Sequence, residues 1–377
     1  MFKSFCLIDS HVHYALPIEY GELTKAMELT GADKMTLVTV PDRNRLLTTP
    51  EALMMKAHDE NKFYVFTSLD VSEYFKHGRQ FGKYMARYVD RALKFGCDGV
   101  KMIEGKPSVR KMLQIIPFDD ERWEPYWCYA EQIGLPILWH VNDPSEFWDK
   151  DKISTWAKSK GWYYDESYVS SSRQYDEVFN VLKRHPNLKI TFAHFFFLSD
   201  NLGRLQTILD AYPNVNVDIT PGIEMYVNLS SCPDKARDFF IKNSTRIIYG
   251  TDIGARAVLK VGSNINFEEC VSRSGLIKSF LSETDKVTVK ADGNFLIGTE
   301  DFQLNCIGLP DDVLKNIFAQ NFGRFVGKSN KVQPKAVINE CRRIKLTVWI
   351  MSLFDKQIKP DYSCADKVIK YFNKGEK

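Results

Sequence analysis

The sequence lacks any hydrophobic run long enough to cross a membrane. Its longest apolar stretch, LTVWIMSLF at 346–354, falls far short of the roughly 20 residues that a membrane-spanning helix needs. Residues 1–10 also lack a long apolar segment and a small-residue cleavage site, so no signal peptide is expected. These absences predict a protein without membrane contact, in which 346–354 forms a buried helix.

Cysteines at metal-binding spacing are also absent. The chain has 8 cysteines but no CxxC motif, which is typical of reduced thiols and not of a disulfide framework or a zinc knuckle. Lys and Arg number 51 and Asp and Glu 48, so the net charge of +3 gives no electrostatic sign of nucleic-acid binding. We therefore expect a cytoplasmic protein that acts on a small molecule, with no nucleic-acid partner.

Glycine-rich phosphate loops of the GxGxxG or GxxxxGKS type are missing, which disfavours a doubly wound open sheet. Short apolar runs instead alternate with amphipathic helical patterns, as is typical of parallel strands joined by helices. The predicted strands are 4–9, 34–40, 62–69, 99–103, 135–140, 188–194, 215–220 and 246–251. The predicted helices between and after them are 22–32, 51–61, 81–96, 121–134, 175–186, 202–213, 233–244 and 275–283. The sequence thus predicts an α/β fold, a distorted (β/α)8 TIM barrel.

The barrel is expected to span 1–330, and 331–377 to form a C-terminal helical extension packed on or beside it. Insertions at 141–174 and 253–310 follow strands five and eight. Because barrel active sites are built at these strand ends, the insertions form either substrate walls or a decorated surface. The same two interpretations are open for the aromatic residues Trp148, Trp156, Trp162, Tyr163 and Tyr164. The extension has 11 Lys or Arg and 5 Asp or Glu; a solvated helix face explains this more simply than an anionic partner.

Histidine is scarce, with 7 in the chain, yet two lie one residue apart in IDSHVHY. Alternate residues of a β-strand share a face, so His11 and His13 should suit one Zn²⁺ or similar ion. An HxH pair alone is a weak signal. Three more residues of ligand type end or follow predicted strands five, six and eight: His140, His194 and Asp252. Because strand ends converge in a barrel, these five side chains predict a metal centre.

Such a centre would activate water. A divalent ion with histidine and carboxylate ligands and an open position lowers the pKa of bound water toward neutrality, and a nearby imidazole can accept the proton. Asp9 is either an acceptor for an imidazole N–H or an ordinary polar residue at a strand end. The other histidines, His58, His77 and His185, fit surface or capping roles.

Several segments together resemble the amidohydrolase superfamily. They are IDSHVHY, GLPILWH, RHPNLKITFAH, RIIYGTD and GLPDDVLKNIFAQNFGRFVG, and they lie within residues 5–327. They are most similar to the branch that includes amidohydrolase-related hydrolases and aminocarboxymuconate-semialdehyde-type decarboxylases.

This resemblance implies a distorted barrel in which His11, His13, His140 and Asp252 bind one divalent metal, usually zinc. Mn²⁺, Fe²⁺ and Co²⁺ are the alternatives, and a two-metal site is less expected. The resemblance also implies that His194 positions or deprotonates the water on the metal, and that Asp252 takes a proton from it.

Lys101 is open to two interpretations. It lies on predicted strand four, where two-metal members of the superfamily carry a carboxylated lysine that bridges the ions. The branch most similar to this chain usually has one metal, so Lys101 and Arg256 are alternatively expected to receive a substrate carboxylate through charge-assisted hydrogen bonds.

The leading prediction is therefore metal-dependent hydrolysis of a small ester, lactone or amide. Non-oxidative decarboxylation of an unsaturated or aromatic acid is the alternative, because both reactions use one metal, one histidine and one aspartate. An inactive metal-binding scaffold is a third hypothesis. A homodimer is also compatible with the sequence.

Overall fold

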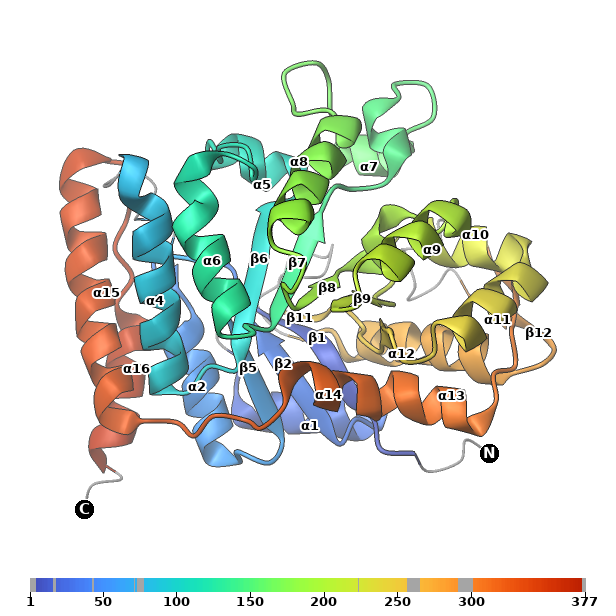
Figure 1. Cartoon of the computed structure of the whole chain (residues 1–377). Helices are drawn as coiled ribbons and strands as arrows, with labels where there is room; N and C mark the ends of the chain where they lie inside the picture. Colours follow the sequence, from blue (N-terminus) through green and yellow to red (C-terminus); the bar gives the residue numbers. More distant parts are fainter. Residues whose placement is uncertain are drawn as a thin grey trace. The chain divides into compact units, whose positions relative to one another are not determined.

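Parallel strands form the main sheet of the protein. The computed structural model describes residues 5–15, 18–42, 44–70, 72, 78–222, 224–255, 265–290 and 301–374. Nine strands form one sheet in the order β10-β9-β8-β7-β6-β5-β2-β1-β11 (Figure 1). Their bounds are β1 Ile8–Tyr14, β2 Lys34–Val38, β5 Phe63–Ser68, β6 Gly99–Gly105, β7 Ile137–Val141, β8 Ile190–Phe192, β9 Val215–Asp218, β10 Ile247–Ile248 and β11 Ile253–Ala255. With helices between successive strands, this is the topology of a distorted (β/α)8 barrel.

Helices follow most of these strands. Their bounds are α1 Tyr20–Thr30, α2 Thr49–His58, α4 Phe81–Phe95, α5 Pro107–Met112, α6 Glu124–Gln132, α7 Thr155–Ser159, α8 Ser171–Arg184, α9 Leu202–Ala211, α10 Met225–Ser231, α11 Pro233–Lys242, α12 Phe267–Ser282, α13 Asp311–Lys315, α14 Asn321–Val326, α15 Pro334–Phe354 and α16 Ser363–Lys374. Two short antiparallel pairs complete the structure: β3 Pro41–Asp42 with β4 Leu46–Leu47, and β12 Lys286–Val289 with β13 Phe302–Asn305. Within the described part of the chain, no helix is both long and apolar enough to cross a membrane.

The predicted strands agree with the structure except at the N-terminus. Seven of them overlap the strands β2 and β5–β10, whose residues are mostly buried, as expected for a parallel sheet covered on both faces. The predicted strand 4–9 is displaced, because the strand runs over Ile8–Tyr14 and includes the HxH pair. The short strand β11 was not predicted; it follows Asp252 and pairs with β1.

The chain divides into two compact units. The first comprises Met1–Lys101, Gly250–Ser274 and Phe318–Lys377, and the second comprises Met102–Tyr249 and Gly275–Ile317. The first unit contains β1, β2, β5 and β11, and the second contains β7 to β10. Strand β6 begins in the first unit and ends in the second.

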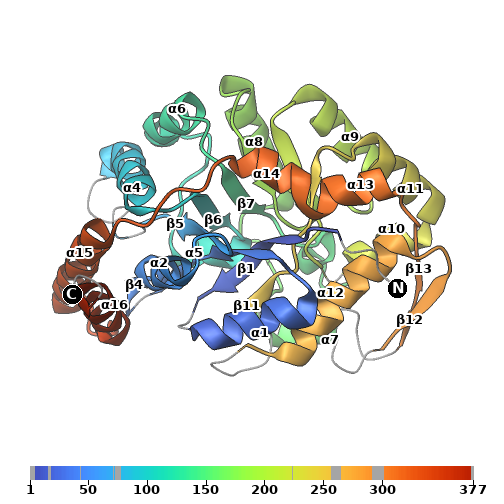
Figure 2. The same ribbon diagram turned by 90° about the horizontal axis from the view of Figure 1, so that it is seen from below.

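The C-terminal extension consists of α15 and α16, which pack together and against α2 in the first unit, while α15 also contacts α4 (Figures 1 and 2). The prediction of a helix at 346–354 is confirmed, but the prediction that it is buried is wrong. Thr347 and Val348 are buried, whereas Trp349 is 51% exposed and Phe354 is 88% exposed. Only one face of α15 packs against the other helices.

The insertion that follows β7 has a small core of its own. Phe147, Ile153, Ala157 and Tyr164 form this core, and the partly buried rings of Trp148, Trp156, Trp162, Tyr163 and Tyr168 pack against it. Packing within the insertion therefore accounts for these aromatic residues.

Candidate metal centre

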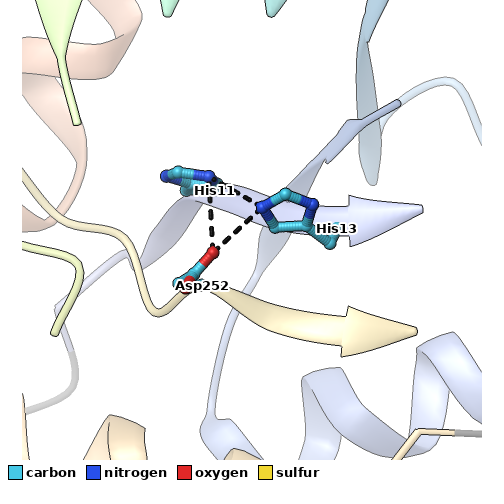
Figure 3. A group of neighbouring side chains, drawn as sticks. All are labelled: His11, His13 and Asp252. Carbon is cyan, nitrogen blue, oxygen red and sulfur yellow. Dashed lines mark hydrogen bonds and ion pairs between the residues drawn. The ribbon is translucent and has the colours of Figure 1, made fainter. Parts of the chain in front are cut away.

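Three residues of the first unit converge where the second half of β1 runs beside the start of β11 (Figure 3). The Nε2 atoms of His11 and His13 lie 3.3 Å apart. Oδ1 of Asp252 lies 3.5 Å from the first of these nitrogens and 3.0 Å from the second. His11 is fully buried, while His13 and Asp252 keep 13% and 17% of their side chains exposed. One side of this cluster is thus open to a small ligand.

Strand pairing explains how Asp252 comes to lie beside the histidines. Strands β1 and β11 pair in parallel, with Val12 opposite Ile253 and His13 opposite Gly254. Asp252 precedes β11, and its N–H donates to the carbonyl oxygen of His11 over 2.9 Å. Its φ of 58° lies in the left-handed region, which few residues other than glycine adopt. This turn aims the Asp252 side chain at the imidazoles of β1.

A buried guanidinium also holds Asp252. Arg273 of α12 is 1% exposed and donates through Nη1 to the carbonyl oxygen of Asp252 at 2.9 Å and to Oδ2 at 3.3 Å. Its Nη2 pairs with Glu269 one helical turn earlier, at 2.7 Å. The sequence reasoning missed both residues. The available signal was a glutamate and an arginine at i, i+4 spacing in a helix that also contains apolar residues.

Asp9 anchors the backbone on which the cluster is built. Its carboxylate accepts hydrogen bonds from the Thr251 hydroxyl at 2.5 Å, the Thr251 N–H at 3.1 Å and the His11 N–H at 3.2 Å. These contacts tie β1 to the residue before Asp252. They also satisfy a carboxylate that is fully buried.

Lys101, in β6, lies directly against the cluster. Its buried Nζ is 2.8 Å from Nε2 of His11. Lys101, for which the sequence left two interpretations open, therefore lies beside His11 at the predicted site. Arg256, its proposed companion, lies outside the described residues.

His140 belongs to the second unit, near the end of β7. Its Nε2 lies 3.2 Å from Oδ1 of Asp143, whose carboxylate also pairs with Lys106 at 2.8 Å and accepts from the Tyr164 hydroxyl at 2.5 Å. Burial by itself would raise the pKa of Asp143, but the Lys106 charge and the hydrogen bond with His140 hold it well below its ordinary value. An ionised Asp143 thus fixes the orientation of the His140 ring. Sequence reasoning missed Asp143, Lys106 and this role of Tyr164.

His194 lies beside His140, with ring centroids 5.0 Å apart. The backbone N–H of His194 donates to Asp218 over 2.7 Å, and its Nδ1 lies 3.0 Å from the hydroxyl of Thr220. Its φ is 55°, and the left-handed conformation continues through the three following phenylalanines. Since each such residue costs about 1–2 kcal/mol, the strand β9 contacts must hold this turn in place.

Phe197 is the last residue of this left-handed turn. Its partly buried ring lies 5.4 Å from the ring of His140 and 5.2 Å from that of His194, centroid to centroid. The preceding residues Phe195 and Phe196 are fully buried. The turn therefore presents an aromatic face next to both histidines of the second unit.

Glu224 is a further carboxyl group of the second unit, at the start of α10. Both of its carboxylate oxygens are buried, and no described side chain donates a hydrogen bond to them. Burial raises the pKa of Glu224 to about 8, and the charges of Glu146, Asp143 and Asp200 add to the increase. This group is therefore protonated at neutral pH and able to donate a proton.

The structure thus groups the predicted site residues by unit. His11, His13, Asp252 and Lys101 lie together in the first unit, and His140 lies with His194 in the second. The other histidines have different surroundings. His58 lies between the rings of Tyr20 and Tyr371, and His185 pairs with Glu124 and Glu131. His77 is outside the described residues.

The cluster of the first unit fits a divalent metal by its donors and by its spacing. A tetrahedral ion with nitrogen and oxygen ligands at about 2.0–2.1 Å separates its ligand atoms by about 3.3 Å. The separations among His11, His13 and Asp252 are 3.0, 3.3 and 3.5 Å. A metal on Nε2 of His11 would replace the contact with Lys101. Two imidazoles and a carboxylate can therefore hold one ion without a change of backbone.

Comparison with known proteins supports the fold. No protein family and no curated protein matches the sequence. Solved structures match over 85% of this chain, among them an uncharacterized TIM-barrel protein from Bordetella bronchiseptica (97% of that chain, 12% identity, TM-score 0.52) and an amidohydrolase II (100%, 12%, 0.51). A dihydroxybenzoic acid decarboxylase from Polaromonas sp. JS666, solved with manganese and 2-nitroresorcinol, also matches (97%, 12%, 0.50). The chain thus shares the (β/α)8 barrel fold of these solved structures.

Proposed function

We propose that this protein is an amidohydrolase-related, metal-dependent hydrolase that cleaves a small ester, lactone or amide. The observation that supports this most directly is the convergence of His11, His13 and Asp252, with ligand atoms 3.0–3.5 Å apart. Structural zinc sites are usually closed by cysteines, whereas this cluster has none and keeps one exposed side, as catalytic sites do.

In this proposal His11, His13 and Asp252 hold one divalent ion, with His140 as a fourth ligand inferred from the sequence. Zinc fits this mixed nitrogen and oxygen set, and manganese is an alternative. When bound, the metal would supply Lewis acidity and make water a nucleophile at neutral pH.

The protein's own groups would then move the protons. We assign the general base to Asp252, whose negative charge the buried Arg273 guanidinium stabilises. We assign a second acid–base role to Nε2 of His194, because Thr220 engages Nδ1 and so fixes the ring. Such a group contributes roughly 10²–10⁴ in rate.

Non-oxidative decarboxylation is the second candidate. A structure of the same fold is a dihydroxybenzoic acid decarboxylase. In addition, the partly buried ring of Phe197 beside His140 and His194 would suit an aromatic substrate. In this reaction the substrate would lose CO₂ and its ring carbon would take a proton from a protein acid.

Elemental analysis of EDTA-treated and zinc- or manganese-reloaded protein tests the metal site. We expect about one tight ion per chain in the wild type and in the control His58→Ala, and none in His11→Ala/His13→Ala. An equal metal content in all three proteins would refute the proposed ligands. A content of about two ions would place a carboxylated Lys101 between them.

Substrate panels then separate the reactions. The metal-loaded protein should release acid from an ester, lactone or amide in a pH-stat assay, and His13→Ala should abolish this release. Release of CO₂ from an aromatic or unsaturated acid, without hydrolysis, would favour the second candidate. No turnover in either panel would leave an inactive metal-binding scaffold.

Lys101 and Arg256 are further proposed to receive a carboxylate of the substrate. If so, Lys101→Ala and Arg256→Ala should raise KM for every active acidic substrate more than they lower kcat. An unchanged KM would contradict this role. We also propose a cytoplasmic location, which the free state of all 8 cysteines supports.

A further inference from the structure

A row of large apolar side chains is exposed along the second half of α15. We call it the α15 stripe, and its members are Leu346 (56% exposed), Trp349 (51%), Ile350 (36%), Leu353 (61%) and Phe354 (88%). Spacings of three, four, seven and eight residues place all of them on one face of the helix. Scattered apolar residues are normal on a protein surface, but a continuous row of this size marks a contact site.

Packing of the helix within its own unit does not require the α15 stripe. The buried face of α15 consists of other residues, among them Val337, Cys341, Ile344 and Val348. This face meets α2, α4 and α16 (Figures 1 and 2). The helix therefore has two apolar faces, of which only one is used within the chain.

We infer that the α15 stripe is the contact between two copies of this chain, with the two α15 helices antiparallel across a two-fold axis. The stripe is symmetric along the sequence: Leu346 and Leu353 lie at equal distances from the midpoint between Trp349 and Ile350. In an antiparallel pair centred there, Leu346 faces Leu353 of the second copy. A two-fold contact requires such a self-complementary pattern.

The exposed area agrees with a dimer. At the exposures above, the five side chains present on the order of 600 Å² per chain, and pairing would bury on the order of 1,200 Å² in total. This exceeds the roughly 1,000 Å² expected of a specific interface. Aromatic residues at its centre, such as Trp349, are typical anchors of protein contacts.

Nearby charges favour a second copy over an anionic membrane. Two of the cations next to the α15 stripe are paired with acidic residues of this chain: Lys345 with Asp366 at 2.6 Å, and Arg343 with Asp70 at 2.8 Å. The exposed Arg342 precedes the stripe and Asp355 follows it. Antiparallel pairing brings these opposite charges within one helical turn of each other, whereas parallel pairing would place like charges together.

Sedimentation velocity of the full-length protein over a range of micromolar concentrations tests this inference. The wild type should sediment as a dimer, and Trp349→Glu and Leu353→Glu should sediment as monomers with unchanged circular dichroism. Met112→Glu is the matched control, since Met112 is 69% exposed on α5 and lies outside the stripe. It should remain a dimer.

A charge pair tests the antiparallel register. Leu346→Lys and Leu353→Glu should each weaken the dimer at least tenfold in Kd, and an equal mixture of the two should recover part of the affinity. A monomeric wild type, or a dimer that Trp349→Glu leaves intact, would overturn the inference. So would co-sedimentation of a monomer with phosphatidylserine vesicles. None of these outcomes depends on bound metal, so they are independent of the proposed function.

Discussion

Glu224→Gln should make the protein more stable, and increasingly so as the pH rises. The wild-type carboxyl group is buried without a donor from any described side chain, and its pKa is raised from 4.5 to about 8. In the unfolded chain the group ionises at its ordinary pKa. Between these two values the folded state binds more protons than the unfolded state, so the free energy of unfolding falls as the pH rises. Glutamine removes this loss because it does not ionise.

The magnitude follows from the two pKa values. The two pKa values differ by about 3.5 units, and each unit corresponds to about 1.4 kcal/mol. The gain in the free energy of unfolding above pH 8 is therefore at most about 5 kcal/mol. Local relaxation and water entry reduce such costs, so we expect about 2–4 kcal/mol at pH 8.5 and less than about 1 kcal/mol at pH 5. For a chain of 377 residues this corresponds to roughly 3–5 °C in Tm at pH 8.5.

Urea denaturation followed by tryptophan fluorescence, at pH 5 and pH 8.5, measures this difference. Glu166→Gln is the control, because Glu166 is an exposed carboxyl of the insertion after β7. Glu166→Gln should change the free energy of unfolding only slightly, and by the same amount at both pH values. If the gain from Glu224→Gln is the same at both pH values, or larger at pH 5, Glu224 is not a neutral group in the folded protein.

Three further predictions concern stability and metal. Lys56→Met should lower the free energy of unfolding, measured in urea, by about 3–5 kcal/mol, because the Lys56–Asp98 pair is fully buried and the carboxylate would keep only uncharged hydrogen-bond donors. Arg273→Gln should cost about 2–4 kcal/mol by removing the guanidinium that pairs with buried Glu269, and should also weaken zinc retention in competition with a chelator, since Asp252 loses its contact with Arg273. Zinc added to chelator-treated protein at a thousandfold excess over Kd should stabilise it by about 4 kcal/mol, seen as a higher Tm, and should not do so in the double histidine variant described above.

Much of the barrel could be predicted because burial on both faces of a parallel sheet leaves a direct pattern in the sequence. The runs that became β5 and β7 are continuous and apolar, and every residue of both strands is buried. Positions at strand ends could be predicted for the same reason. The structure places the ligand-type atoms of His11, His13 and Asp252 within 4.8 Å of one another, and their role in holding a metal stays a prediction. The buried state of β1 could not be predicted, because its Asp9 is satisfied by Thr251, which lies 242 residues away.

Residues that support the site residues from outside the predicted strand ends left little trace in the sequence. Arg273 reaches Asp252 from a helix of an expected insertion, and Asp143 reaches His140 only because the chain turns after β7. The left-handed conformation of His194 depends on Asp218, on the neighbouring strand. The contacts of Arg273 and Asp218 join residues 21 and 24 positions apart, and the contact of Asp143 depends on the turn after β7, so spacing alone could not identify them.

Two glycines show how strand register constrains the histidines themselves. A Cβ atom on Gly254 would overlap the carbonyl oxygen of His13, and one on Gly105 would overlap that of His140. Each glycine lies on the strand next to the histidine, β11 beside β1 and β6 beside β7. Close approach of two backbones admits only glycine at such positions. Nothing in the sequence distinguishes these two from the other glycines among the 21 of the chain. The strand register shows that even alanine at either position would displace a strand that carries a histidine.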